Sequence, residues 1–151
     1  MIETLIDVAN KQKKDEAALG AWRGLRHIVK QGAMPGTPPR GFKREPITVT
    51  NEKGDERQAH RWVPDPDYIP RIRKAFQMRA AGRSLDEINK ATRLFGSINS
   101  WRTFFNNKLY IGILEFGSLT IEDYCKPIVS KAIWDKVQAH QAKYAAKQHT
   151  R

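Results

Sequence analysis

The chain has 151 residues, 40% of them hydrophobic, with a formal net charge of +11 and a pI near 10.0. This length corresponds to one domain, or to a small domain with an appendage, and it is enough to bury a core. The excess of 27 lysines and arginines over 16 acidic residues favours a polyanionic partner, with nucleic acid ahead of an anionic membrane.

The reactive residues exclude several classes of protein. Cys125 is the single cysteine, which excludes an internal disulfide framework and a zinc site built on paired cysteines. The four histidines lack metal-ligand spacing, and neither a glycine-rich phosphate loop nor a Ser-His-Asp order is present. No apolar run approaches the about 18 residues of a membrane span, and no signal peptide opens the chain. We therefore expect a cytoplasmic protein with no metal, no cofactor and no membrane partner.

Residues 1–31 are predicted to form one long helix that ends at Gly32. The segment lacks proline, and apolar residues recur at helical spacing near both of its ends. Its middle, KQKKDEAALGA, is too polar to be buried on all sides. The helix is therefore either a free arm or a contact for self-association, or else an ordinary packing helix with a solvated charged face.

A loop and a β-hairpin are expected next. Three glycines and three prolines in GAMPGTPPRGF, residues 32–42, leave no room for regular structure. From Pro46 to Val63, two alternating runs flank Lys53-Gly54-Asp55, which is a turn signal. We expect a hairpin with an exposed, charged tip.

Three helices are predicted between residues 66 and 107. The first ends at Gly82, and the second, residues 85–95, opens with a capping box of Ser84 and Glu87. Ser97 or Ser100 is expected to cap the third, which is short. Two helices joined by a short glycine-containing turn, with a third in support, are typical of a helix-turn-helix.

A second hairpin and a last helix complete the predicted fold. Residues 110–124, YIGILEFGSLTIEDY, alternate on both sides of Gly117-Ser118, and helix-helix-helix-hairpin is the order of a winged helix. Ser130 caps the last helix, whose exposed lysines would follow phosphates or simply be solvated: Lys131, Lys136, Lys143 and Lys147. The predicted class is α+β, mainly helical, with a long N-terminal helix followed by a winged-helix-like helix-turn-helix domain and short β-hairpins.

The third helix, in SWRTFFNNKLYIG, has two chemically different faces. At helical spacing, Trp101, Phe104 and Phe105 share one face and are expected in the core. The other face is predicted to carry Arg102, Thr103, Asn106 and Asn107. Arginine pairs with guanine, asparagine pairs with adenine, and a threonine methyl contacts thymine, so this face suits the major groove. Any amphipathic helix also has a polar face, and that plainer interpretation stays open.

Four segments resemble the recombinase domain of the large serine recombinases, the family of phage integrases and transposon resolvases. They are GAWRGLRHIVKQGAMPGTPPRGF, WVPDPDYIPRIRKAFQMRAAGRSLDEINKAT, FFNNKLYIGIL and PIVSKAIWDKVQ, in order over about residues 20–142. The third is similar to a Leu-x-Asn-Pro-x-Tyr-x-Gly motif at Phe105, Asn107, Tyr110 and Gly112. Lys108 departs from the motif's proline, and Arg40 stands where the family often has an aromatic residue.

The resemblance implies a sequence-specific DNA-binding module that docks a recombinase on attachment-site half-sites during DNA integration or recombination. Residues 1–31 would be the arm or linker from a catalytic domain that this chain lacks, and residues 32–151 would be the recombinase DNA-binding domain. The partner is then double-stranded DNA. The residues expected to contact it are Arg40, Lys43, Arg83, Asn99, Ser100, Arg102, Thr103, Asn106, Asn107 and Lys108.

The resemblance also implies that this chain does not cut DNA alone, because the family's nucleophilic serine lies in an N-terminal catalytic domain. Enzymatic activity of the chain itself is therefore not expected. A stand-alone winged-helix transcriptional regulator that dimerises through the first helix is the alternative. The proline-glycine loop of residues 32–42 favours the recombinase domain, because a simple regulator has no need of it.

Overall fold

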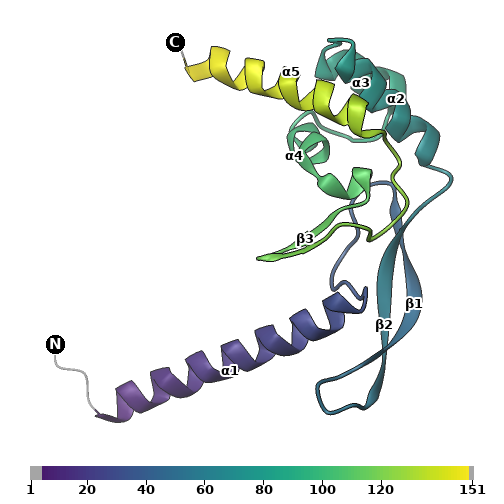
Figure 1. Ribbon diagram of the computed structural model, residues 1–151. Coiled ribbons are helices and arrows are strands. Elements are labelled where there is room, and N and C mark those ends of the chain that lie inside the picture. The colour runs from purple at the N-terminus through teal and green to yellow at the C-terminus, as the bar shows by residue number, and fades with distance from the viewer. Residues whose placement is uncertain (1–4, 150–151) are drawn as a thin grey trace. The chain divides into compact units, whose positions relative to one another are not determined.

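The computed structural model describes residues 5–149, and for residues 145–149 it describes the backbone alone. The elements, labelled in Figure 1, are α1 (Leu5–Lys30), β1 (Phe42–Thr50), β2 (Glu56–Pro64), α2 (Ile69–Ala80), α3 (Leu85–Thr92), α4 (Ser100–Asn106), the 3₁₀ helix η1 (Lys108–Ile111), β3 (Leu114–Phe116), β4 (Leu119–Ile121) and α5 (Lys131–His149). The predicted class, a mainly helical α+β chain with small hairpins, is confirmed. Within the described residues, the chain forms two compact units: 5–35 with 45–61, and 36–44 with 62–149.

The first unit contains α1 and most of the first hairpin. The long helix is confirmed over Leu5–Lys30, while residues 1–4 of the prediction lie outside the described part. Residues 5–19 are exposed all round, whereas Val29 is fully buried. The Gln31 side chain joins the helix end to β1, because its Nε2 donates to the Thr50 carbonyl (2.8 Å) and its Oε1 accepts from the Thr50 N–H (2.9 Å).

The hairpin of β1 and β2 is a separate two-stranded sheet. Its turn is confirmed, since Asn51 Oδ1 accepts from the N–H groups of Lys53 (3.0 Å) and Asp55 (2.9 Å), and Gly54 has a positive φ of 87°. The first strand begins at Phe42 and not at Pro46 as predicted. A proline inside the strand is tolerated because a strand with one neighbour has a free side that needs no N–H donor.

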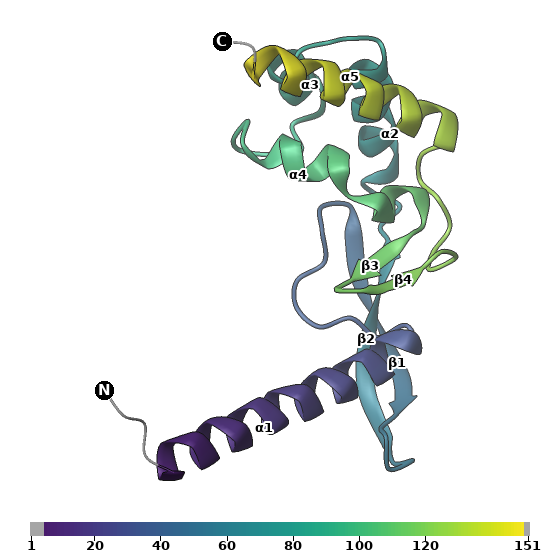
Figure 2. The ribbon, with the colours of Figure 1, turned by 60° about the vertical axis from the view of Figure 1, so that its left-hand side comes forward.

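The second unit is built around a cluster of aromatic rings. Phe76 of α2 lies at its centre, with ring-centroid distances of 5.3 Å to Phe104, 5.2 Å to Phe105, 5.6 Å to Tyr110 and 5.9 Å to Trp134. These rings come from α4, η1 and α5, so α2 is the element on which the others pack. Figures 1 and 2 both show α4 beside α2 and α5.

Three predicted boundaries in this unit are wrong. The helix expected over residues 85–95 ends at Thr92, because Arg93 has a left-handed backbone (φ 52°) that cannot continue it. Neither Ser97 nor Ser100 caps α4: the helix begins at Ser100 after Asn99, which makes no side-chain cap bond. Tyr110, expected in the second hairpin, lies in η1.

Other predicted features of the second unit are confirmed. Ser84 Oγ accepts from the Glu87 N–H (3.2 Å) and Ser130 Oγ accepts from the Ile133 N–H (3.3 Å), so both serines cap their helices. The strands β3 and β4 pair antiparallel around Gly117-Ser118, with Phe116 opposite Leu119. Trp134 and Val137 of α5 are buried as expected.

Candidate nucleic-acid interface

The polar face of α4 is the strongest candidate for a nucleic-acid interface. Trp101, Phe104 and Phe105 are buried, as predicted from their spacing. The opposite face is exposed and carries a row of four side chains at positions i, i+3, i+4 and i+7, which share one side of a helix: Asn99, Arg102, Thr103 and Asn106. Asn99 precedes the helix but has helical dihedral angles (φ −62°, ψ −28°), so the row continues through it. We call these four residues the α4 polar row.

Hydrogen bonds to two neighbouring helices fix the rotation of α4 about its axis. Trp101 Nε1 donates to Asn89 Oδ1 of α3 (3.2 Å), and Gln138 Nε2 of α5 donates to the Phe105 carbonyl (2.7 Å). Phe95, in the loop before α4, packs edge-on against the Trp101 ring at 5.0 Å. The helix therefore presents its polar row in one orientation, and a partner does not have to order it.

The α4 polar row has unused hydrogen-bonding capacity. Among the described residues, the side chains of Asn99, Arg102, Thr103 and Asn106 have no hydrogen-bond, ion-pair or ring partner. An arginine offers five donors in a planar fork, and an asparagine amide offers both donors and an acceptor. Pairing with base edges or phosphates thus breaks no internal bond.

The remaining predicted contact residues differ in the interactions that their side chains make within the protein. Lys43, in β1, and Ser100, the first residue of α4, have no side-chain partner among the described residues. Arg83 pairs with Glu87 (3.3 Å), and Lys108 pairs with Glu115 (2.9 Å). Both pairs are half exposed, so they are weak and exchange readily with a phosphate. The Arg40 guanidinium lies over the Phe95 ring at 5.4 Å.

Asn107 does not belong to the polar row, contrary to the prediction. It is half-buried, and its Oδ1 accepts from the Leu109 N–H (3.0 Å), which caps η1. Lys108 begins η1 without a proline, so the motif's turn forms in its absence. The family motif at Asn107, Tyr110 and Gly112 therefore serves the fold next to α4.

Two buried ionisable groups, Tyr110 and Arg79, form hydrogen bonds between distant segments of this unit. Burial raises the pKa of the Tyr110 phenol, an effect that the Arg40 charge partly opposes. Burial lowers the pKa of Arg79, whose Nε and Nη2 donate to Gln141 Oε1 of α5 and whose Nη1 donates to the Arg83 carbonyl (3.0 Å). Arg79 falls on the apolar stripe of α2, four residues after Ala75, which was the sequence signal for its burial.

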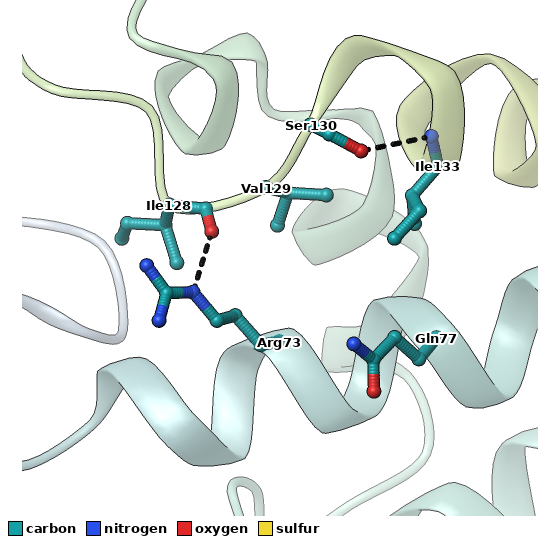
Figure 3. A pocket seen from close by; sticks show the side chains of 6 residues that line it. All are labelled: Arg73, Gln77, Ile128, Val129, Ser130 and Ile133. Carbon is teal, nitrogen blue, oxygen red and sulfur yellow. Dashed lines mark hydrogen bonds between the residues drawn. The ribbon is translucent and has the colours of Figure 1, made fainter.

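A shallow hollow of about 170 Å³ lies between α2 and the start of α5 (Figure 3). Its lining is Arg73, Gln77, Ile128, Val129, Ser130 and Ile133. Arg73 Nε donates to the Ile128 carbonyl (3.0 Å) and Ser130 Oγ serves as the helix cap, so these polar groups stabilise the junction of the two helices. The hollow is small and mostly apolar, and it offers no cluster of catalytic groups.

Two further features, a metal site and a membrane-spanning helix, are absent from the part of the chain that the structure describes. Among the side chains that the structure describes, residues 5–144, no group of three or more histidine, cysteine, aspartate or glutamate residues is placed to hold a metal ion. None of the described helices has the length and apolar character needed to cross a membrane.

Comparison with known proteins identifies the family. The Recombinase family model matches residues 66–143, a little over half of the chain. The chain therefore belongs to the Recombinase family, and the resemblance predicted from the sequence is confirmed. The matched segment includes α2, α3, α4, both strands of the second hairpin and most of α5.

A solved structure shares the fold. It is described as the crystal structure of an LSR–DNA complex, where LSR denotes a large serine recombinase, and it matches with a TM-score of 0.61 at 14% sequence identity. The match covers 83% of this chain and 39% of that chain, so this chain spans well under half the length of its structural relative. A search of curated proteins finds no match to this chain.

Proposed function

We propose that this chain is the DNA-binding module of a large serine recombinase and that it docks the recombinase on attachment-site half-sites. The observation that carries the proposal is the α4 polar row: four exposed, unpartnered side chains on a buried aromatic base, in a member of the Recombinase family. The structural relative is described as a complex with DNA, which supports a double-stranded DNA partner.

In this proposal, affinity and sequence preference come from two different kinds of contact. The net charge of +11 provides attraction to phosphates that does not depend on sequence. The α4 polar row provides discrimination, because Arg102 and Asn106 can pair bidentately with guanine and adenine in the major groove. A helix-turn-helix formed by α3 and α4, with β3 and β4 as the wing, is the docking geometry we propose.

The domain assignment follows from the same proposal. Residues 1–31 act as the linker from a catalytic serine domain of the parent recombinase, and residues 32–151 act as the DNA-binding domain. In this arrangement the chain positions the enzyme and contributes no nucleophile to strand cleavage. The alternative of a stand-alone winged-helix regulator shares the order of α2, α3, α4, β3 and β4, but the family match favours the recombinase.

The test compares a selected duplex with an unrelated one. A preferred duplex is first selected from a randomised library with the full chain, and dissociation constants are then measured for Arg102→Ala and Asn106→Ala. Each substitution is expected to cost about 1–3 kcal/mol on the selected duplex and little on the unrelated one. Lys136→Ala, which removes an exposed charge from α5, is the matched control and should affect both duplexes equally.

Two outcomes would contradict the proposed role of α4. Equal losses on both duplexes, with the fold intact by circular dichroism, would show that the helix contacts the DNA backbone alone. Unchanged binding to both would remove α4 from the interface. Affinity should also fall steeply with salt, since each neutralised phosphate contributes about 0.9 to the slope of log K against log salt.

A further inference from the structure

Ile98 is an exposed apolar side chain in the turn that precedes α4. It is 47% exposed, and the other large exposed apolar side chain among the described residues of the second unit is Tyr144, on α5. Single exposed apolar residues are common on protein surfaces, so exposure alone carries no argument. The position of Ile98 beside the α4 polar row is what singles it out.

The backbone fixes Ile98 relative to α4. The Trp101 N–H donates to the Ile98 carbonyl (3.2 Å), and Asn99 continues the helical dihedral angles between Ile98 and the helix. Three residues earlier, the Phe95 ring packs edge-on against Phe104 at 5.5 Å, which anchors the loop to the core. Ile98 therefore lies in a hydrogen-bonded turn that leads into α4, two positions before its first residue.

This position lies four residues before Arg102, which is the spacing of neighbours on a helix surface. The exposed Ile98 side chain therefore flanks the polar row at the N-terminal end of α4. The row itself is polar throughout, and Ile98 is the exposed large apolar side chain of the loop between α3 and α4. In the major groove the apolar feature of base edges is the C5-methyl group of thymine.

We propose that Ile98 contacts the C5-methyl group of a thymine beside the base pair that Arg102 contacts, and so adds a preference for T·A at that position. The inference rests on the proposed function, because it requires α4 in the major groove. Burying one methyl group against an isoleucine is expected to change the dissociation constant about fourfold, which corresponds to about 0.8 kcal/mol.

The experiment removes the thymine methyl group and the Ile98 side chain separately. On the duplex selected with the full chain, each thymine is replaced in turn by deoxyuridine, which lacks only the methyl group. At one position the replacement should weaken binding of the wild-type chain about fourfold and leave binding of Ile98→Ala unchanged. Ile98→Val, which keeps a smaller apolar contact, should give an intermediate effect. Thr103→Ser removes the other methyl group of this surface and is the matched control, in which the deoxyuridine effect should persist.

Several results would overturn the inference. They are a selected site without thymine, no deoxyuridine effect at any position, or an effect that persists in Ile98→Ala and disappears in Thr103→Ser. If Arg102→Ala still weakens binding to the selected duplex and not to the unrelated one, the proposed function stands and only the role of Ile98 fails. If the chain selects no sequence and binds all duplexes equally, both fail. Thermal unfolding by circular dichroism should be unchanged in Ile98→Ala, because the side chain is exposed.

Discussion

The phenol of Tyr110 donates a 2.6 Å hydrogen bond to the backbone carbonyl of Arg40, 70 residues earlier in the chain. The ring is buried against Phe42 (5.5 Å) and Phe104 (4.7 Å). One side chain therefore joins the proline-glycine loop, the start of β1 and the aromatic core beneath α4. The tyrosine of the family motif is therefore a structural residue that packs on the buried face of α4.

Tyr110→Phe should lower the free energy of unfolding by about 1 kcal/mol, because a buried hydrogen bond is lost while the ring packing is kept. Urea denaturation followed by circular dichroism measures this. Tyr144→Phe, at a position that is 52% exposed, is the control and should have little effect. Equal stability of Tyr110→Phe and the wild type would show that the bond to Arg40 contributes nothing.

The stability of the chain should fall in alkaline solution because of Tyr110. Burial raises the pKa of this phenol in the folded state, whereas an unfolded tyrosine titrates near 10. Above about pH 10 the unfolded state loses a proton that the folded state keeps, so the free energy of unfolding falls as the pH rises, by up to about 1.4 kcal/mol per pH unit. The difference in slope between wild type and Tyr110→Phe, measured by urea denaturation between pH 9 and 11, isolates this contribution. Identical slopes would contradict it.

Gly112→Ala should be strongly destabilising. Gly112 has φ 86°, a conformation that costs other residues about 1–2 kcal/mol, and an added Cβ would lie 2.5 Å from the Cys125 carbonyl oxygen. Gly96→Ala is the matched control, since a Cβ there meets no atom within 4 Å. Thermal unfolding should show a clear loss for the first variant and almost none for the second. A comparable loss in both would mean that the close approach to Cys125 is not the cause.

The two neighbouring asparagines should give different defects. Asn107→Ala removes the cap of η1 and is expected to lower the free energy of unfolding by about 0.5–2 kcal/mol. Its DNA binding should fall only at temperatures where part of the protein is unfolded. Asn106→Ala removes an exposed amide. It should leave the free energy of unfolding unchanged and weaken binding to the selected duplex. Measuring unfolding and DNA binding on both variants checks this separation. A stable Asn107→Ala variant that has lost sequence preference would place Asn107 in the interface after all.

The N-terminal part of α1 should exchange its amide hydrogens rapidly. Residues 5–18 are exposed on all sides, so they have no packing to stabilise the helix, whereas Val29 is buried. Hydrogen exchange should therefore show weak protection over residues 5–18 and strong protection near Val29. Strong protection over residues 5–18 in a chain shown to be monomeric would contradict a free arm. Protection that appears with rising protein concentration would indicate self-association.

Periodicity alone predicted most of the helices and the face of α4 that packs. The spacing of Trp101, Phe104 and Phe105 is enough to place them in the core, because a helix repeats every 3.6 residues. The caps at Ser84 and Ser130 were also predictable, since each serine precedes an apolar helical run. The turns at Gly54 and Gly117 follow in the same way from glycine-containing turn signals.

What could not be predicted depends on contacts between distant segments. The left-handed conformation of Arg93 carries no sequence signal. It ends α3 before Leu94, which is buried in the core, and Phe95, whose ring packs on Trp101. Helical spacing predicts Asn107 on the same face as Asn106, but the chain leaves α4 at Asn107, which caps η1 instead. The sequence also could not predict which lysines and arginines form ion pairs. Lys108 pairs with Glu115 because the second hairpin folds back toward η1.

If α4 contacts DNA as proposed, its length limits how many base pairs one copy of the chain can contact through this helix. Seven residues form a helix about 10 Å long, which spans about three base pairs of B-DNA at 3.4 Å per step. So short a recognition sequence recurs throughout a genome that offers about 10⁶ or more competing sites. Under the proposed function, a target site longer than this requires base contacts from protein segments other than α4.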